Sequence, residues 1–173
     1  MITYNLKMMM KRKILLGLIL LVVVTGHTQI LTFEFSSLSG DETSANSNFN
    51  HADLNSSTIS RGIGLTASGN GGRFNATGWA LTSIDNAVSG DDYMEFTITP
   101  KAGNQFSVSS IVVQWQRSST GNVAIALRSS VDGYSTNLDA IKSVTDNTNT
   151  QTFTWTFTQT NSSAPVTYRF NLS

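Results

Sequence analysis

Apolar and polar residues alternate with a period of two through most of this chain. In segment 93–99, Met94, Phe96 and Ile98 fall on one side, with charged and hydroxyl-bearing residues on the other. Successive side chains of a strand point to opposite faces, so this pattern predicts an antiparallel strand with one solvated face. The pattern recurs at 30–35, 106–115, 123–127, 152–158 and 166–170, and more weakly at 59–65 and 73–81.

Turn signals separate these segments. Pairs such as Asn70-Gly71 and Asp132-Gly133 accept a positive φ at little cost, so the chain can reverse there. No stretch shows an amphipathic helical period of useful length. Seven or eight short strands predict an all-β domain, an antiparallel two-sheet β-sandwich with a jelly roll as the first topology. The polar stretch 36–57 is too long for a hairpin turn, and we expect it to cross between sheets or to form a loop held by something bound.

The amino end predicts a signal peptide over residues 1–29. A basic cluster at 11–13 precedes an apolar run at 14–24, and residues 25–29 are small or polar. The run is too short to cross a bilayer, which takes about 20 residues, and this disfavours a membrane anchor. We therefore expect a mature β-sandwich domain at 30–173 that is secreted or displayed at the cell surface and has no membrane association of its own.

Net charge limits the possible partners of the mature chain, and cysteine content limits how it is stabilised. Removing the signal peptide leaves seven basic residues against eleven acidic ones, a net charge of about −4, which disfavours a nucleic-acid partner. The sequence contains no cysteine, so no disulfide framework supplies stability and a hydrophobic core must do so. A domain of this length buries about 68–70 % of its unfolded surface, which is enough for such a core.

Several segments together resemble a known group of proteins. They are Leu-Thr-Phe-Glu-Phe at 31–35, the Gly78-Trp79 pair, Asp-Tyr-Met-Glu-Phe-Thr-Ile-Thr-Pro at 92–100, Trp-Gln-Arg-Ser at 115–118, and Leu-Arg-Ser-Ser-Val-Asp-Gly-Tyr at 127–134. Their order and spacing are similar to those of uncharacterised exported bacterial β-sandwich modules that precede type IX secretion or PEP-CTERM sorting signals. The resemblance implies one more strand beyond the equivalent of Tyr168, followed by further domains or a sorting tail. Two alternatives follow from it: the domain at 30–173 lacks a final strand, or the module is complete in a shorter form.

The mature chain offers few parts for catalysis. His51 is its single histidine, and the sequence has neither a cysteine nor a Gly-x-Ser-x-Gly nucleophile elbow. Asp91, Asp92 and Glu95 are close in sequence, but they lie in a turn and on the wet face of a strand, where solvated acids are the expected interpretation. We predict that the protein is not an enzyme; a hydrolase with an unrecognised site is the least favoured alternative.

A structural calcium ion is the one cofactor that the sequence suggests. Calcium takes six to eight oxygen ligands from carboxylates and carbonyls. Glu34, Asp41 and Glu42 form the candidate set, and Asp91 with Asp92 forms a second one. Neither set has the spacing of a defined calcium loop.

Exposed aromatic rings with polar neighbours are the usual basis of sugar binding. Trp115 and Trp155 share faces with apolar residues and are expected in the core. Trp79, Tyr93 and Tyr134 are the candidates for a ligand platform, with Arg128 as polar support. The alternative for each aromatic is a partly covered ring that closes the edge of the sandwich.

These observations favour a non-catalytic secreted or cell-surface module that is adhesive or carbohydrate-binding. Its expected partner is a polysaccharide or a cell-surface glycan. The alternative is a structural spacer that carries further domains of a larger exported protein.

Overall fold

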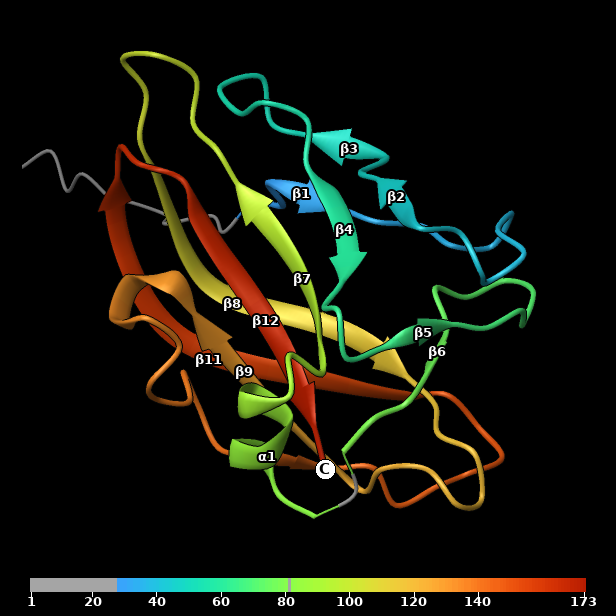
Figure 1. The fold of residues 1–173 in the computed structure, drawn as a ribbon. Helices are drawn as coiled ribbons and strands as arrows, with labels where there is room; N and C mark the ends of the chain where they lie inside the picture. The colour runs from blue at the N-terminus through green and yellow to red at the C-terminus, as the bar shows by residue number, and fades with distance from the viewer. Residues whose placement is uncertain (1–27, 81) are drawn as a thin grey trace, which may run out of the picture.

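The computed structural model describes residues 28–80 and 82–173, so the predicted signal peptide lies outside the described residues except for its last two positions. The chain forms an antiparallel two-sheet β-sandwich, which confirms the predicted fold class (Figure 1). In the described part of the chain, no helix is both long enough and apolar enough to cross a membrane.

The larger sheet has six strands, and its centre is formed by the end of the chain. The last strand, β12 (Val166–Leu172), pairs antiparallel with β7 (Tyr93–Ile98) on one side and with β9 (Ala124–Ser129) on the other. The order across the sheet is β10 (Lys142–Ser143), β9 (Ala124–Ser129), β12 (Val166–Leu172), β7 (Tyr93–Ile98), β4 (Thr58–Arg61) and β2 (Ser44–Asn46).

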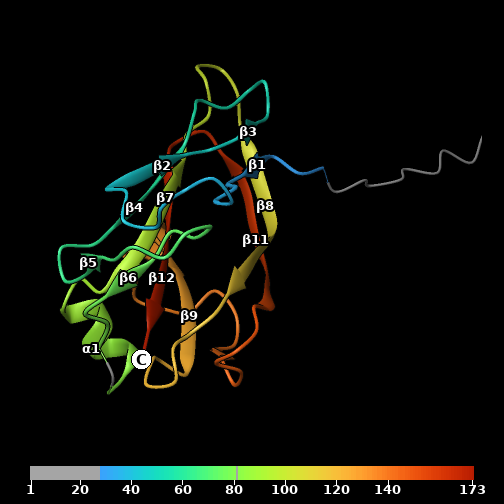
Figure 2. The same ribbon diagram turned by 90° about the vertical axis from the view of Figure 1, so that its right-hand side faces the viewer.

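The second layer is an antiparallel pair of long strands, β8 (Phe106–Trp115) and β11 (Gln151–Ser162). Figure 2 shows this pair facing the larger sheet. The chain crosses between layers from β7 to β8, from β8 to β9, from β10 to β11 and from β11 to β12. Two short ribbons complete the strands: β1 (Leu31–Thr32) pairs with β3 (Phe49–Asn50), and β5 (Thr66–Ala67) pairs with β6 (Ala76–Thr77).

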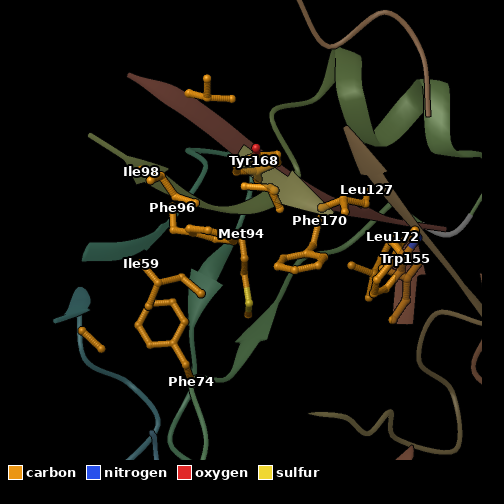
Figure 3. Packing of buried hydrophobic residues seen from close by; sticks show 14 of the residues in the cluster. Ile59, Phe74, Met94, Phe96, Ile98, Leu127, Trp155, Tyr168, Phe170 and Leu172 are labelled. Carbon is orange, nitrogen blue, oxygen red and sulfur yellow. The ribbon is translucent and has the colours of Figure 1, made fainter. Parts of the chain in front are cut away.

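The core lies between the two layers and is rich in aromatic rings. Trp155 of β11 is fully buried, and its ring centroid lies 5.6 Å from that of Phe170 on β12. Phe96 of β7 stacks on Tyr168 at 5.5 Å. Figure 3 shows these side chains gathered with Met94, Phe74 and Ile59. The period-two pattern therefore predicted correctly which residues of β7, β11 and β12 face inward.

Two features differ from the sequence prediction. A short helix, α1 (Ile84–Ser89), follows Ser83, whose hydroxyl accepts a hydrogen bond from the Asn86 amide as an N-cap. The helix is too short to give a recognisable amphipathic pattern in the sequence, yet it buries Ile84 and Ala87 against the outer face of the larger sheet. The polar stretch 36–57, expected as a crossover or loop, contains strands β2 and β3.

Candidate functional site

A row of charged side chains crosses the outer face of the larger sheet. Arg169 on β12 is the register partner of Glu95 on β7 and of Arg128 on β9. The neighbours of Arg169 along β12, Tyr168 and Phe170, point into the core, so alternation directs Arg169 outward. The pairing of three distant strands therefore places one carboxylate and two guanidinium groups side by side.

Arg169 is the centre of this row. Its Nε donates a hydrogen bond of 2.8 Å to Glu95 Oε2. Its guanidinium carbon lies 3.7 Å from the ring centroid of Tyr93 and 3.9 Å from that of Tyr134. Contacts of a cation with an aromatic face at these distances are attractive because of the quadrupole of the ring. About a fifth of the Arg169 side chain stays exposed, so the group is held in place and still reaches solvent.

Arg128 is buried beside Arg169 and fixes the loop that carries Tyr134. Its three nitrogens donate to Asn137 Oδ1 at 2.9 Å, to the Tyr134 carbonyl at 3.1 Å and to Asp85 Oδ1 at 3.0 Å. Two like charges on neighbouring strands repel each other, and the ion pairs with Asp85 and Glu95 offset that repulsion. Arg128 thus ties helix α1 and the loop after β9 to the sheet.

The loop presents Tyr134 in a strained backbone conformation. Tyr134 has a φ of 63°, in the left-handed region that residues other than glycine avoid. It follows Gly133, which has a φ of 70°. A one-turn helix, η1 (Ser130–Asp132), leads into this turn, and the Tyr134 amide donates to the Ser129 carbonyl at 2.9 Å. Strain of this kind persists only where surrounding contacts impose it, and it concentrates at ligand sites.

Tyr93 is confined from the side of β4. A Cβ atom added at Gly62 would lie 2.9 Å from two atoms of the Tyr93 ring and 2.0 Å from the Asp91 carbonyl oxygen. Partial burial raises the pKa of the Tyr93 hydroxyl, and the Glu95 and Asp91 carboxylates raise it further, while Arg169 acts in the opposite direction. The ring is therefore neutral near pH 7 and has little room to move.

Three of the four predicted ligand-binding residues therefore come together. We define the outer-face cluster as Tyr93, Glu95, Arg128, Tyr134 and Arg169. The sequence prediction contained Tyr93, Arg128 and Tyr134 but missed Arg169 and treated Glu95 as a solvated acid. The outward position of Arg169 between Tyr168 and Phe170 was a signal that could have identified it.

Trp79, the fourth predicted residue, lies elsewhere. It packs against the hydrophobic core, with its ring centroid 5.9 Å from that of Trp115 in an edge-to-face arrangement. Its indole nitrogen donates to the Ala76 carbonyl at 3.2 Å. Trp79 thus differs from the expectation of an outward ring, because residues 78–80 lie outside any strand and strand alternation does not govern their direction.

Glu42, one of the three residues predicted to bind calcium, holds the turn at Ser39 and Gly40. The Glu42 carboxylate accepts hydrogen bonds from the amides of Ser39 and Gly40 at 2.6 and 3.0 Å and from the Ser39 hydroxyl at 2.8 Å. Desolvation opposes ionisation, but a hydrogen bond from the Glu42 amide together with those from Ser39 and Gly40 outweighs it and lowers the pKa of Glu42 to about 2. Over residues 28–80 and 82–173, no three histidine or carboxylate side chains form a group that could hold a metal, and calcium at Glu34, Asp41 and Glu42 stays a prediction.

The other candidates for chemistry are dispersed. His51 Nδ1 lies 3.5 Å from Asp53 Oδ2, and both side chains are about half exposed at the rim of a small pocket. The Asp92 carboxylate is buried and accepts a hydrogen bond of 3.0 Å from the Ala80 amide. These groups brace loops, and none of them lies in the outer-face cluster.

Comparison with protein-family models, with curated proteins and with solved structures finds no match to this chain. Fold alone does not define function, since one fold carries many unrelated sites. The side chains of the outer-face cluster are therefore the features of this chain that bear on its function.

Proposed function

We propose that the chain is a non-catalytic module, secreted or displayed at the cell surface, that binds a polysaccharide or a cell-surface glycan through the outer-face cluster. The predicted signal peptide supports export. The absence of cysteine means that the core of the module is stabilised without disulfides. The single observation that carries the binding proposal is the contact of Arg169 with the rings of Tyr93 and Tyr134, beside Glu95.

The chemistry of the cluster suits a sugar. Aromatic rings contact the C–H faces of a pyranose, while guanidinium donors and carboxylate acceptors bind its hydroxyl groups. The strained turn at Tyr134 and the close approach of Gly62 to Tyr93 fix both rings before a ligand arrives. A site fixed in advance loses less side-chain entropy on binding, so its few contacts contribute more to affinity.

A glycan array with residues 30–173 tests the proposal. We expect binding to at least one polysaccharide, and we expect Tyr134→Ala and Arg169→Ala to weaken it about tenfold or more, equivalent to about 1.4 kcal/mol. Thr154→Ala is the matched control, because Thr154 is exposed on β11 in the opposite layer. Binding that survives both cluster variants would place the site elsewhere, and no binding to any glycan would overturn the proposal.

A structural spacer is the second candidate. It is favoured by the extent to which the cluster satisfies itself, since all three nitrogens of Arg128 and Nε of Arg169 donate to protein acceptors. In that case the cluster only braces the face of the sheet. Cluster variants would then lower thermal stability, and a glycan array with the unaltered domain would be blank.

A further inference from the structure

The outer-face cluster has hydrogen-bonding capacity that the protein does not use. Arg169 donates from Nε to Glu95 Oε2, and this is the only hydrogen bond of its side chain within the described ranges. Its two terminal nitrogens, with four N–H groups, therefore lack protein acceptors there. Glu95 Oε1 and the hydroxyl groups of Tyr93 and Tyr134 are likewise without partners in this part of the chain. The cluster thus offers donors and an acceptor next to each other.

Each arginine of the cluster is already paired with a carboxylate. Arg169 pairs with Glu95 at 2.8 Å, and Arg128 pairs with Asp85 at 3.0 Å. The carboxylate of Asp91 adds a third negative charge that acts on the Tyr93 hydroxyl. An anionic ligand at Arg169 would therefore also meet the negative charge of Glu95, and like charges in a partly desolvated site repel strongly. A ligand without charge meets no such penalty.

Adjacent hydroxyl groups fit this arrangement. A hydroxyl group both donates and accepts, whereas a guanidinium only donates and a carboxylate only accepts. Two neighbouring hydroxyls of a sugar can therefore bind an arginine–carboxylate pair with opposite polarity, one accepting from the terminal nitrogens of Arg169 and one donating to Glu95. The adjacent tyrosine rings supply apolar surface for the C–H groups of the same sugar.

Building on the proposed glycan binding, we infer that the outer-face cluster selects neutral sugars with adjacent free hydroxyl groups over acidic sugars. Glu95 and Arg169 recognise the hydroxyl pair, and Tyr93 and Tyr134 contact the sugar ring. Arg128 holds the loop of Tyr134 and does not itself contact the ligand, because its side chain is only 10 % exposed and each of its nitrogens already donates to a protein acceptor.

Isothermal titration of residues 30–173 with neutral gluco-, manno- and xylo-hexasaccharides and with hexagalacturonate tests the inference. We expect at least one neutral ligand to bind about tenfold or more tightly than the uronate. We expect its affinity to change little between about 0.05 and about 0.5 M salt, because screening acts on charges and the ligand carries none. Tighter binding of the uronate, or a steep loss of neutral binding with salt, would overturn the inference and leave glycan binding intact. No binding to either class would overturn the proposed function itself.

Two conservative variants give a second readout. Glu95→Gln keeps the size of the side chain and removes its charge, and we expect it to weaken neutral binding because a charged acceptor bonds more strongly than an amide. Arg169→Lys keeps the charge and removes the planar donor fork, and we expect it to weaken binding as well. Thr154→Ala is again the control, and circular dichroism verifies that each variant is folded. Neutral binding that is unchanged or stronger in Glu95→Gln would show that Glu95 does not bind the ligand and would overturn the inference.

Discussion

The ring centroid of Tyr134 lies 3.9 Å from the guanidinium carbon of Arg169, and the ring reaches this position from a backbone conformation that tyrosine rarely adopts. Arg128 links the two residues of this contact. It donates a hydrogen bond to the Tyr134 carbonyl, and it is the register partner of Arg169 on the adjacent strand. The contact is thus a product of the loop and the sheet together.

Tyr134 offers a test of its backbone strain. Tyr134→Gly and Tyr134→Ala both remove the ring, but only glycine adopts a φ of 63° freely. We expect the glycine variant to be more stable than the alanine variant by about 1 kcal/mol, the usual cost of the left-handed region for a residue with a Cβ. Urea unfolding of the two variants measures the difference. Equal stabilities would mean that the turn relaxes once the ring is gone.

Gly62 is expected to tolerate no side chain. A Cβ there would lie 2.0 Å from the Asp91 carbonyl oxygen and 2.9 Å from the Tyr93 ring, so the backbone must move. We expect Gly62→Ala to cost about 1–3 kcal/mol of unfolding free energy, as other overpacked sites do. Gly69→Ala is the matched control, because its nearest neighbours lie 4.0 Å away. Thermal unfolding of both variants compares them, and equal melting temperatures would contradict the predicted collision.

Trp155 is fully buried, and its indole nitrogen has no hydrogen-bond acceptor among the described residues. We expect Trp155→Ala to cost about 3–5 kcal/mol because it leaves a large cavity. Trp155→Phe is expected to cost clearly less, because it keeps most of the ring volume and removes an unsatisfied buried N–H group. Denaturant unfolding of the two variants measures both costs. A phenylalanine variant as unstable as the alanine variant would indicate that the indole nitrogen has a partner.

The contacts of Asp139 predict that the stability of the fold decreases at acidic pH. Its carboxylate accepts from the Thr156 amide of β11 and from the Ala140 amide, and it pairs with Lys142, which lowers its pKa from 3.8 to about 2. A pKa that is lower in the folded state contributes stability that is present above pH 4 or so and is lost as the pH falls through about 2. Thermal unfolding of the wild type and of Asp139→Asn between neutral and acidic pH measures this. We expect the variant to be less stable at neutral pH, with a gap that narrows in acid; a constant gap would contradict the assignment.

The sequence identified the strands because their signal is local. Alternation in 93–99, 123–127 and 152–158 depends only on neighbouring residues. It therefore predicted the inward positions of Phe96 and Trp155 and the outward position of Tyr93, and it directed Arg128 away from the face of Leu127. Helix α1 escaped prediction because its six residues are stabilised by a Ser83 cap and by burial of Ala87 against the sheet, neither of which produces a long periodic pattern.

The tertiary structure decided which outward residues meet. Arg169, Glu95 and Arg128 become neighbours only through the antiparallel register of β7, β12 and β9, and a shift by one residue would turn Arg169 toward the core. Trp79 was expected on the platform, but it lies outside any strand, just after β6, and packs inward beside Trp115 instead. The sequence by itself therefore determined the all-β fold and the two faces of each strand. Strand pairing, loop strain and the helix over the sheet brought Arg169 between Glu95, Tyr93 and Tyr134, because such long-range contacts leave no periodic trace along the chain.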